Sequence, residues 1–536
     1  MLTPIIILTY IITTMKKILL SLIVLLGVTA VQAAKPRTSL KISTTRKQTI
    51  SGFGGACCDG AMKPFGSSNA CISKLYGPSK LSKIGLNILR MEISPSFEGD
   101  NWGDYDWNGS LPSAQTVKRR DGIVFGTPWS PPGDYKTNGT AQGGNAEDQG
   151  YQKGKLREDC YGKFFPWLNT FLKWMKDHGV VMDAVSIQNE PDWWVSYSGC
   201  LYEPEEQVNL VKNYAHLLDR EAYNGVRIIS AEPLGYRKDY FDALMNDQTC
   251  REQVDIFAGH IYGHMPLQYI KPVAQMALPL GKEVWMTEHS VTDNIDHLPT
   301  WKENLIFAEE LNECMLAGCT GYIYWYLRAH WSFCGTGEPW GYSVWENGQE
   351  IKKTANDPNN KKDELLPRAF VMSHFSRNVT GSTRLETNKD DKAGREEEGK
   401  LQDEQFSAYI KGDSIIVMAI NAREDTRDVN ITLPYNVKSG ELWLSTGNES
   451  DKLCQKLNLN DITESTNKYL YEMPAQSLNT FIFMIDKGST AIENIEAAND
   501  EAPKTYYDLQ GRRLDTPRGL CIERSANGHS GKIMIK

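Results

Sequence analysis

The 536-residue sequence lacks a basic excess, since 58 Lys and Arg are outnumbered by 67 Asp and Glu and the formal net charge is −9. Binding to nucleic-acid phosphates needs a basic face, so we expect no nucleic-acid partner. Only 9 His accompany 11 Cys, and no Cys/His cluster has the spacing of a zinc site. We therefore expect no metal and no other cofactor.

Long uninterrupted apolar runs are also missing. Lys16-Lys17 divide the apolar amino terminus into runs shorter than the roughly 20 residues of a membrane span. A basic pair, the apolar run 18–28 and small residues at Val31-Gln32-Ala33 are typical of a signal peptide. We assign residues 1–34 to it, with Met15 as the expected start and 1–14 as an upstream extension. The mature chain should contain no transmembrane span and be exported, whether secreted, periplasmic or on the cell surface.

An odd cysteine count leaves at least one thiol unpaired in an exported protein whose other cysteines can form disulfides. Spacing alone does not define the pairs. The first candidates are Cys57-Cys58 with Cys71, and Cys160 with Cys200.

Aromatic residues, in contrast, are abundant, with 14 Trp and 24 Tyr. Core packing accounts for roughly two thirds of such rings. The remainder suit a ligand with flat apolar faces, such as a sugar ring.

Short apolar runs that stop at polar, Gly or Pro residues, with amphipathic stretches between them, dominate the first two thirds of the chain. They number eight, as a (β/α)₈ barrel requires. The predicted strands are 52–56, 86–93, 123–128, 182–189, 226–231, 254–262, 283–288 and 321–327. Helices are expected at 203–221 and 301–317, the second ended by Gly318.

Beyond residue 375 the pattern changes to alternating strands separated by turn residues, which is typical of a β-sandwich. These strands are predicted at 406–410, 414–421, 428–433, 441–445 and 477–485. We expect an α/β fold with the barrel at 52–374, a side β-sandwich at 375–487 that also includes the first strands at 35–51, and a linker with a short carboxyl-terminal β tail module at 488–536.

Two glutamates end two of the predicted barrel strands. Pro191 halts the fourth predicted strand just after Glu190, and the seventh ends at Glu288. Each alone could be a solvated or salt-bridged strand end. Because the carboxyl ends of barrel strands gather at one face, the two together predict the paired carboxylates of a glycoside hydrolase. A separation of about 5 to 5.5 Å would indicate a retaining mechanism.

Polar neighbours extend this prediction. Asn189 is placed to bond a sugar 2-hydroxyl, although it could equally cap a turn. Arg90 ends the second strand. A guanidinium favours the ionised form of a carboxylate, which a nucleophile requires and an acid does not. We therefore place Arg90 near Glu288, the expected nucleophile, rather than near Glu190.

Three aromatic residues at strand ends are further candidates. Trp129 and Trp325 could stack on sugar rings, and Tyr262 could hydrogen-bond the nucleophile. Glu232 is a third strand-end carboxylate, for which we prefer a structural role.

An ordered set of motifs resembles glycoside hydrolase family 30, most closely its bacterial glucuronoxylanase branch. The motifs are Gly52-Phe53-Gly54-Gly55, Thr127-Pro128-Trp129-Ser130-Pro131-Pro132, Ser186-Ile187-Gln188-Asn189-Glu190-Pro191-Asp192, His260-Ile261-Tyr262-Gly263 and Trp285-Met286-Thr287-Glu288. The resemblance covers roughly 39–486. It implies a TIM barrel fused to a side β-sandwich, with Glu190 as acid/base and Glu288 as nucleophile of a retaining enzyme.

The sequence differs from that branch after strand eight, where the glucuronoxylanases bind the glucuronate side chain of the substrate. The branch carries two arginines after strand eight; here Arg328, a substrate-binding candidate, is followed by Ala329. Ser290 replaces a Tyr, and 340–366 is an insertion at the same rim. An anionic branch normally needs a bidentate cation, so strict dependence on glucuronate is not expected.

The expected activity is therefore cleavage of β-1,4-xylosidic bonds in xylan by a monomer. A family relative acting on β-1,6-glucan or galactan, and a carbohydrate-binding protein without catalysis, remain as alternatives. The segment 506–536 resembles a tail module of exported proteins from some Gram-negative bacteria and implies sorting or attachment.

Overall fold

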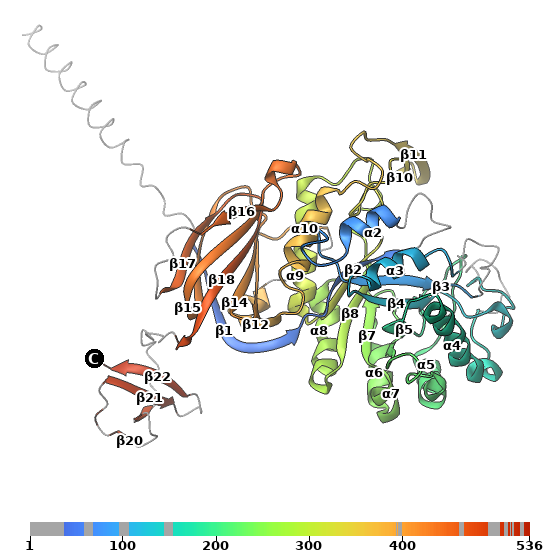
Figure 1. Ribbon diagram of the computed structural model, residues 1–536, viewed down its shortest axis with the longest axis horizontal. Helices are drawn as coiled ribbons and strands as arrows, with labels where there is room; N and C mark the ends of the chain where they lie inside the picture. Colours follow the sequence, from blue (N-terminus) through green and yellow to red (C-terminus); the bar gives the residue numbers. More distant parts are fainter. Residues whose placement is uncertain are drawn as a thin grey trace, which may run out of the picture.

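The computed structural model (Figure 1) describes residues 37–57, 68–95, 107–143, 154–392, 394, 399–459, 466–490, 504–508, 513–514, 516, 519–525 and 530–535. The predicted signal peptide at 1–34 lies outside the described residues, as does 491–503 of the predicted linker. Within the described residues, no helix has both the length and the apolar character needed to cross a membrane.

Eight parallel strands close into a barrel, which confirms the predicted fold class. They are β2 (Gly52–Cys57), β3 (Ile88–Ile93), β4 (Ile123–Pro128), β5 (Ala184–Ser186), β6 (Arg227–Ile229), β7 (Ile256–His260), β8 (Glu283–Glu288) and β9 (Gly321–Tyr324). The interior is filled by side chains: Trp285 is fully buried and meets Phe125 edge-on at 5.4 Å between ring centroids. Gly54 lies against the backbone of Ile88, where a Cβ would collide.

Helices surround the barrel. They are α2 (Asn69–Leu75), α3 (Leu111–Lys118), α4 (Tyr161–Asp177), α5 (Pro204–Tyr214), α6 (Lys238–Asn246), α7 (Gln248–Gln253), α8 (Pro266–Ala277), α9 (Trp301–Ala317) and α10 (Pro367–Ser376). The predicted helix at 301–317 is confirmed as α9, which begins with a capping box between Thr300 and Glu303 and ends at Gly318 with φ 110°. Figure 1 shows α9 and α10 between the barrel and the sandwich, so α9 is buried along nearly its whole length.

The second β unit contains the chain's first described strand as well as its later ones. Its strands are β1 (Arg37–Thr49), β12 (Thr383–Thr387), β13 (Glu404–Lys411), β14 (Ser414–Asn421), β15 (Arg427–Ser445), β16 (Gln455–Asn458), β17 (Thr466–Met473) and β18 (Ser477–Thr490). Strand β1 pairs with both β12 and β15, so six strands form a continuous ring of pairings around a separate hydrophobic core. The two strands predicted at 428–433 and 441–445 are one long strand, β15.

The insertion after β9 forms an antiparallel hairpin of β10 (Trp340–Glu346) and β11 (Gln349–Ala355). The side-chain amide of Asn294 clamps the hairpin's edge by bonding both the N–H and the carbonyl of Ser343, at 2.7 and 3.0 Å. The tail forms its own sheet of β19 (Lys504–Tyr507), β20 (Arg513–Leu514), β21 (Gly519–Ser525) and β22 (Ser530–Ile535).

The disulfide predictions are wrong. Cys160 and Cys200 carry free buried thiols, and Cys71 is a free buried thiol whose Sγ faces the carbonyl of Leu327 at 3.8 Å. Cys58 lies outside the described residues. Spacing along a chain carries no information on whether two Cβ vectors converge, which a disulfide requires.

Candidate active site

Glu190 and Glu288 meet at the carboxyl end of the barrel. Glu288 is the last residue of β8, whereas Glu190 lies four residues beyond β5 in a backbone with φ 43°. A positive φ is costly for a residue with a Cβ and is common at functional sites. It is held there by the Glu190 N–H, which donates to the Glu232 carbonyl at 3.0 Å. One oxygen of each carboxyl lies within 4.8 Å of the other, and both residues are 6% exposed.

Arg90, from β3, holds the nucleophile candidate. Its Nη1 donates to Glu288 Oε2 at 2.5 Å, while Nη2 donates to Asn189 Oδ1 at 2.7 Å and to Glu232 Oε2 at 3.2 Å. The guanidinium is fully buried. The structure thus places Arg90 beside Glu288, at the position predicted from sequence, and Glu232 serves as its second anionic partner.

Tyr262 and His260 complete the shell around the two carboxyls. The Tyr262 hydroxyl donates to Glu288 Oε1 at 3.1 Å, as its place after β7 suggested. His260 ends β7, and its Nδ1 lies 2.9 Å from Glu190 Oε1. Its Nε2 faces the Arg90 guanidinium at 3.5 Å. Because a guanidinium has only donors, Nε2 is the unprotonated nitrogen, and Nδ1–H donates to Glu190.

The pKa values separate the roles of the two carboxyls. Burial raises the pKa of Glu190 to about 8, and Asp192 and Glu232 add to the rise. Burial also raises the pKa of Glu288, against the lowering effects of His260 and Arg90. Since Arg90 bonds Glu288 directly, the pair keeps its proton on Glu190. Burial lowers the pKa of His260 to about 4, so this ring is neutral at neutral pH.

The two tryptophan candidates form one wall. The rings of Trp129 and Trp325 stack with centroids 5.9 Å apart and an interplanar angle of 28°. The guanidinium carbon of Arg90 lies 4.7 Å from the Trp129 ring centroid and 5.9 Å from that of Trp325. Both rings are therefore held against the same cation that binds Glu288.

Arg328 has a different partner from the other site candidates. Its Nε lies 3.2 Å from Asp363 Oδ1, and its side chain is 10% exposed. Asp363 belongs to the insertion after β9 and also accepts a hydrogen bond from Ser68 at 2.6 Å. The insertion thus supplies an anion to the arginine predicted to face the substrate.

Three of these side chains could also serve as metal ligands. Glu190, His260 and Glu288 place one ligand atom each within 4.8 Å of one another. However, Arg90 already bonds Glu288, and its fixed positive charge disfavours a cation at the same point. The hydrogen bonds described above account for the arrangement of all three side chains.

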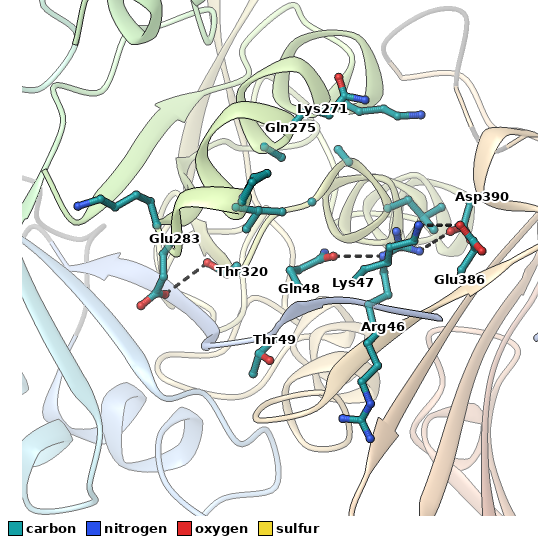
Figure 2. A pocket seen from close by; sticks show the side chains of 18 of the residues that line it. Arg46, Lys47, Gln48, Thr49, Lys271, Gln275, Glu283, Thr320, Glu386 and Asp390 are labelled. Atoms are coloured by element: carbon teal, nitrogen blue, oxygen red, sulfur yellow. Dashed lines mark hydrogen bonds and ion pairs between the residues drawn. The ribbon is translucent and has the colours of Figure 1, made fainter. Parts of the chain in front are cut away.

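A cavity of about 1090 Å³ lies at the opposite end of the barrel (Figure 2), where Glu283 begins β8. It separates the barrel from the β-sandwich. Ion pairs between Lys47 and Glu386, and between Arg384 and Asp390, at 2.6 Å each, form part of its lining. The carboxylate pair of Glu190 and Glu288 does not line this cavity.

Comparison with known proteins shows which enzymes the chain is similar to. The family model described as the glycosyl hydrolase catalytic core matches residues 160–315, the stretch between α4 and the end of α9 that carries both glutamates. The chain is 26% identical over 463 residues to glucuronoxylanase XynC of Bacillus subtilis (strain 168), covering 85% of this chain and 93% of that protein. These matches relate the chain to the glycoside hydrolases of family 30.

Solved structures agree with this assignment. The family 30 subfamily 8 xylanase Xyn30A from Clostridium acetobutylicum superposes on this chain with a TM-score of 0.65 and 28% identity, covering 83% of this chain and 99% of that one. A more distant relative differs in its substrate. Endo-1,6-beta-D-glucanase neg1 of Aspergillus fumigatus is 27% identical over 202 residues, covering 32% of this chain and 41% of that protein.

One residue in the shell around the two carboxyls, His260, is not predicted from the sequence. The sequence assigns His260 no role, because a histidine within an apolar strand is typical of a core residue. The available signal was its position, which matches that of Glu288 at the end of β8.

Proposed function

We propose that this protein is a retaining endo-β-1,4-xylanase in which Glu190 is the acid/base and Glu288 the nucleophile. The observation that carries the proposal is the close pair of carboxyls, with oxygens within 4.8 Å, held by different partners. Retaining enzymes have carboxyl groups about 5 to 5.5 Å apart, whereas inverting enzymes leave room for a water molecule between them.

In the first step Glu190 gives its proton to the glycosidic oxygen while a Glu288 oxygen bonds the anomeric carbon, and the bond to the leaving sugar breaks. In the second step Glu190, now ionised, takes a proton from water, whose oxygen displaces Glu288. The raised pKa of Glu190 suits the acid, and Arg90 and Tyr262 hold the nucleophile. Asn189 accepts from Arg90 through Oδ1, which leaves its NH₂ group to donate to the sugar 2-hydroxyl.

Trp129 and Trp325 would stack on sugar rings, and Arg328 stays a substrate-binding prediction. Its ion pair with Asp363 supports a site that does not depend on a glucuronate branch, because the arginine's charge already has a partner. Ala329 offers no second cation.

The test is hydrolysis of matched xylans with and without glucuronate side chains, by the wild-type protein and by Glu288→Gln. We expect the wild type to release reducing sugar from both polymers, with kcat/KM values within about tenfold, and Glu288→Gln to release essentially none. Activity confined to the glucuronate-bearing polymer would contradict the branch preference. Full activity of Glu288→Gln would contradict the nucleophile.

A β-1,6-glucan or galactan substrate is the second candidate, favoured by the partial match to endo-1,6-beta-D-glucanase neg1. The same assay on β-1,6-glucan and galactan separates the two, since fold does not decide the sugar. Retained xylan binding without any hydrolysis would instead support a carbohydrate-binding protein. We further propose that the protein acts as an exported monomer.

A further inference from the structure

We propose that Glu310 and His289 form a positioning pair, which holds Tyr262 and Trp325 around the nucleophile candidate Glu288. The inference rests on the proposed function and extends it to a helix that does not touch the substrate. Its basis is a chain of contacts that runs from α9 to Glu288.

Glu310 lies on α9 and is 1% exposed. Its Oε1 is 2.9 Å from His289 Nδ1 and accepts a hydrogen bond from the Tyr322 hydroxyl at 2.6 Å. A buried carboxylate is costly unless such donors compensate for lost hydration. One carboxyl oxygen therefore joins α9 to the residue after β8 and to a residue of β9.

His289 connects this carboxylate to the site. It follows Glu288 directly, just beyond the end of β8, and its ring points toward Glu310 of α9 while the Glu288 carboxyl faces Arg90. Its ring centroid is 4.9 Å from that of Tyr262, and its backbone carbonyl accepts a hydrogen bond from the backbone N–H of Trp325 at 3.0 Å. His289 thus contacts both Tyr262, which donates to Glu288, and the backbone of Trp325, whose ring is a stacking candidate.

The same helix offers a matched control. Glu313 lies one turn further along α9 and is fully buried, but it accepts from Gln405 of the sandwich at 2.7 Å. Glu310→Gln and Glu313→Gln make the same chemical change in the same helix at equal depth. The first change removes the carboxylate that contacts His289 and Tyr322, whereas the second removes one that accepts from Gln405 of the sandwich.

We expect Glu310→Gln to lower kcat on xylan about tenfold with KM changed less than twofold, because misplacement of the supporting shell affects the reacting geometry. The acidic limb of kcat/KM should move to higher pH, since a weaker Tyr262 hydrogen bond disfavours ionised Glu288. Combining Glu310→Gln with Tyr262→Phe should lower kcat by less than the product of the two single effects.

Glu313→Gln should leave kcat and the acidic limb unchanged, and its effect should multiply with that of Tyr262→Phe. Multiplicative effects for Glu310→Gln as well, or an unmoved acidic limb, would overturn the positioning pair while leaving the proposed function intact. A wild-type protein that hydrolyses no polysaccharide would overturn the proposed function, and the positioning role with it.

Discussion

Replacing Glu190 with Gln should stabilise the folded protein while abolishing the proposed acid/base step, and the gain should grow with pH. The folded protein buries this carboxyl at 6% exposure. Burial raises its pKa from the ordinary 4.5 to about 8. Gln has similar size and hydrogen-bonding capacity but no proton to lose.

The sign follows from where the proton sits in each state. Between pH 4.5 and about 8 the unfolded chain has released it while the folded chain retains it, so rising pH favours unfolding. The stability associated with this proton is fully present below pH 4.5 and is lost as pH passes about 8. At 1.36 kcal/mol for each pH unit, the loss over this window is at most about 5 kcal/mol. The Glu190→Gln variant does not undergo this loss of stability, because its side chain has no proton to release.

Thermal melting of the wild type and of Glu190→Gln at pH 5 and pH 8 checks this. The excess in Tm of the variant should be small at pH 5 and several degrees larger at pH 8. Glu364→Gln, at a side chain 61% exposed, is the control and should shift neither value. An equal Tm difference at both pH values would refute the argument that burial holds the proton on Glu190.

Four further outcomes are expected. The wild-type kcat/KM should fall about tenfold per pH unit above pH 8 as Glu190 loses its proton, which a pH profile would show. Arg90→Met should cost about 3–5 kcal/mol in urea unfolding, because two buried carboxylates lose their shared cation. His374→Ala should cost about 2–4 kcal/mol without altering KM, since its ring nitrogens connect α10 to Thr480 and Ser445 of the sandwich, at 2.8 Å each. Prolonged treatment with EDTA should leave activity unchanged, and loss restored by a divalent metal would contradict a metal-free site.

Strand positions in the barrel could be predicted because fully buried parallel strands are continuous apolar runs with clear stops. The predictions for β4 and β8 match the structure at both ends. The prediction for β5 was too long, because the chain leaves the ladder after Ser186 to reach the strained conformation at Glu190. Strand β16 was missed because its side chains are all exposed and carry no apolar alternation.

Functional residues gather at the carboxyl ends of barrel strands, and this rule predicts the residues at or just beyond those ends. It does not predict contacts that depend on tertiary packing. Glu190 and Glu288 follow from it, and Arg90 follows from charge. Glu310 could not have been found, because it lies on a helix among several buried polar residues and its partner is chosen by the packing of α9. The contact of Arg328 with Asp363 likewise depends on where the insertion folds back.

The charge of the whole site is consistent with the proposed reaction. At neutral pH the raised pKa of Glu190 keeps it protonated and the lowered pKa of His260 keeps it neutral. Arg90 pairs with both Glu232 and Glu288, so one cation faces two carboxylates. Because Glu232 shares the Arg90 guanidinium with Glu288, the cation is not paired with the proposed nucleophile alone, which favours negative charge on Glu288 remaining available to a developing oxocarbenium ion.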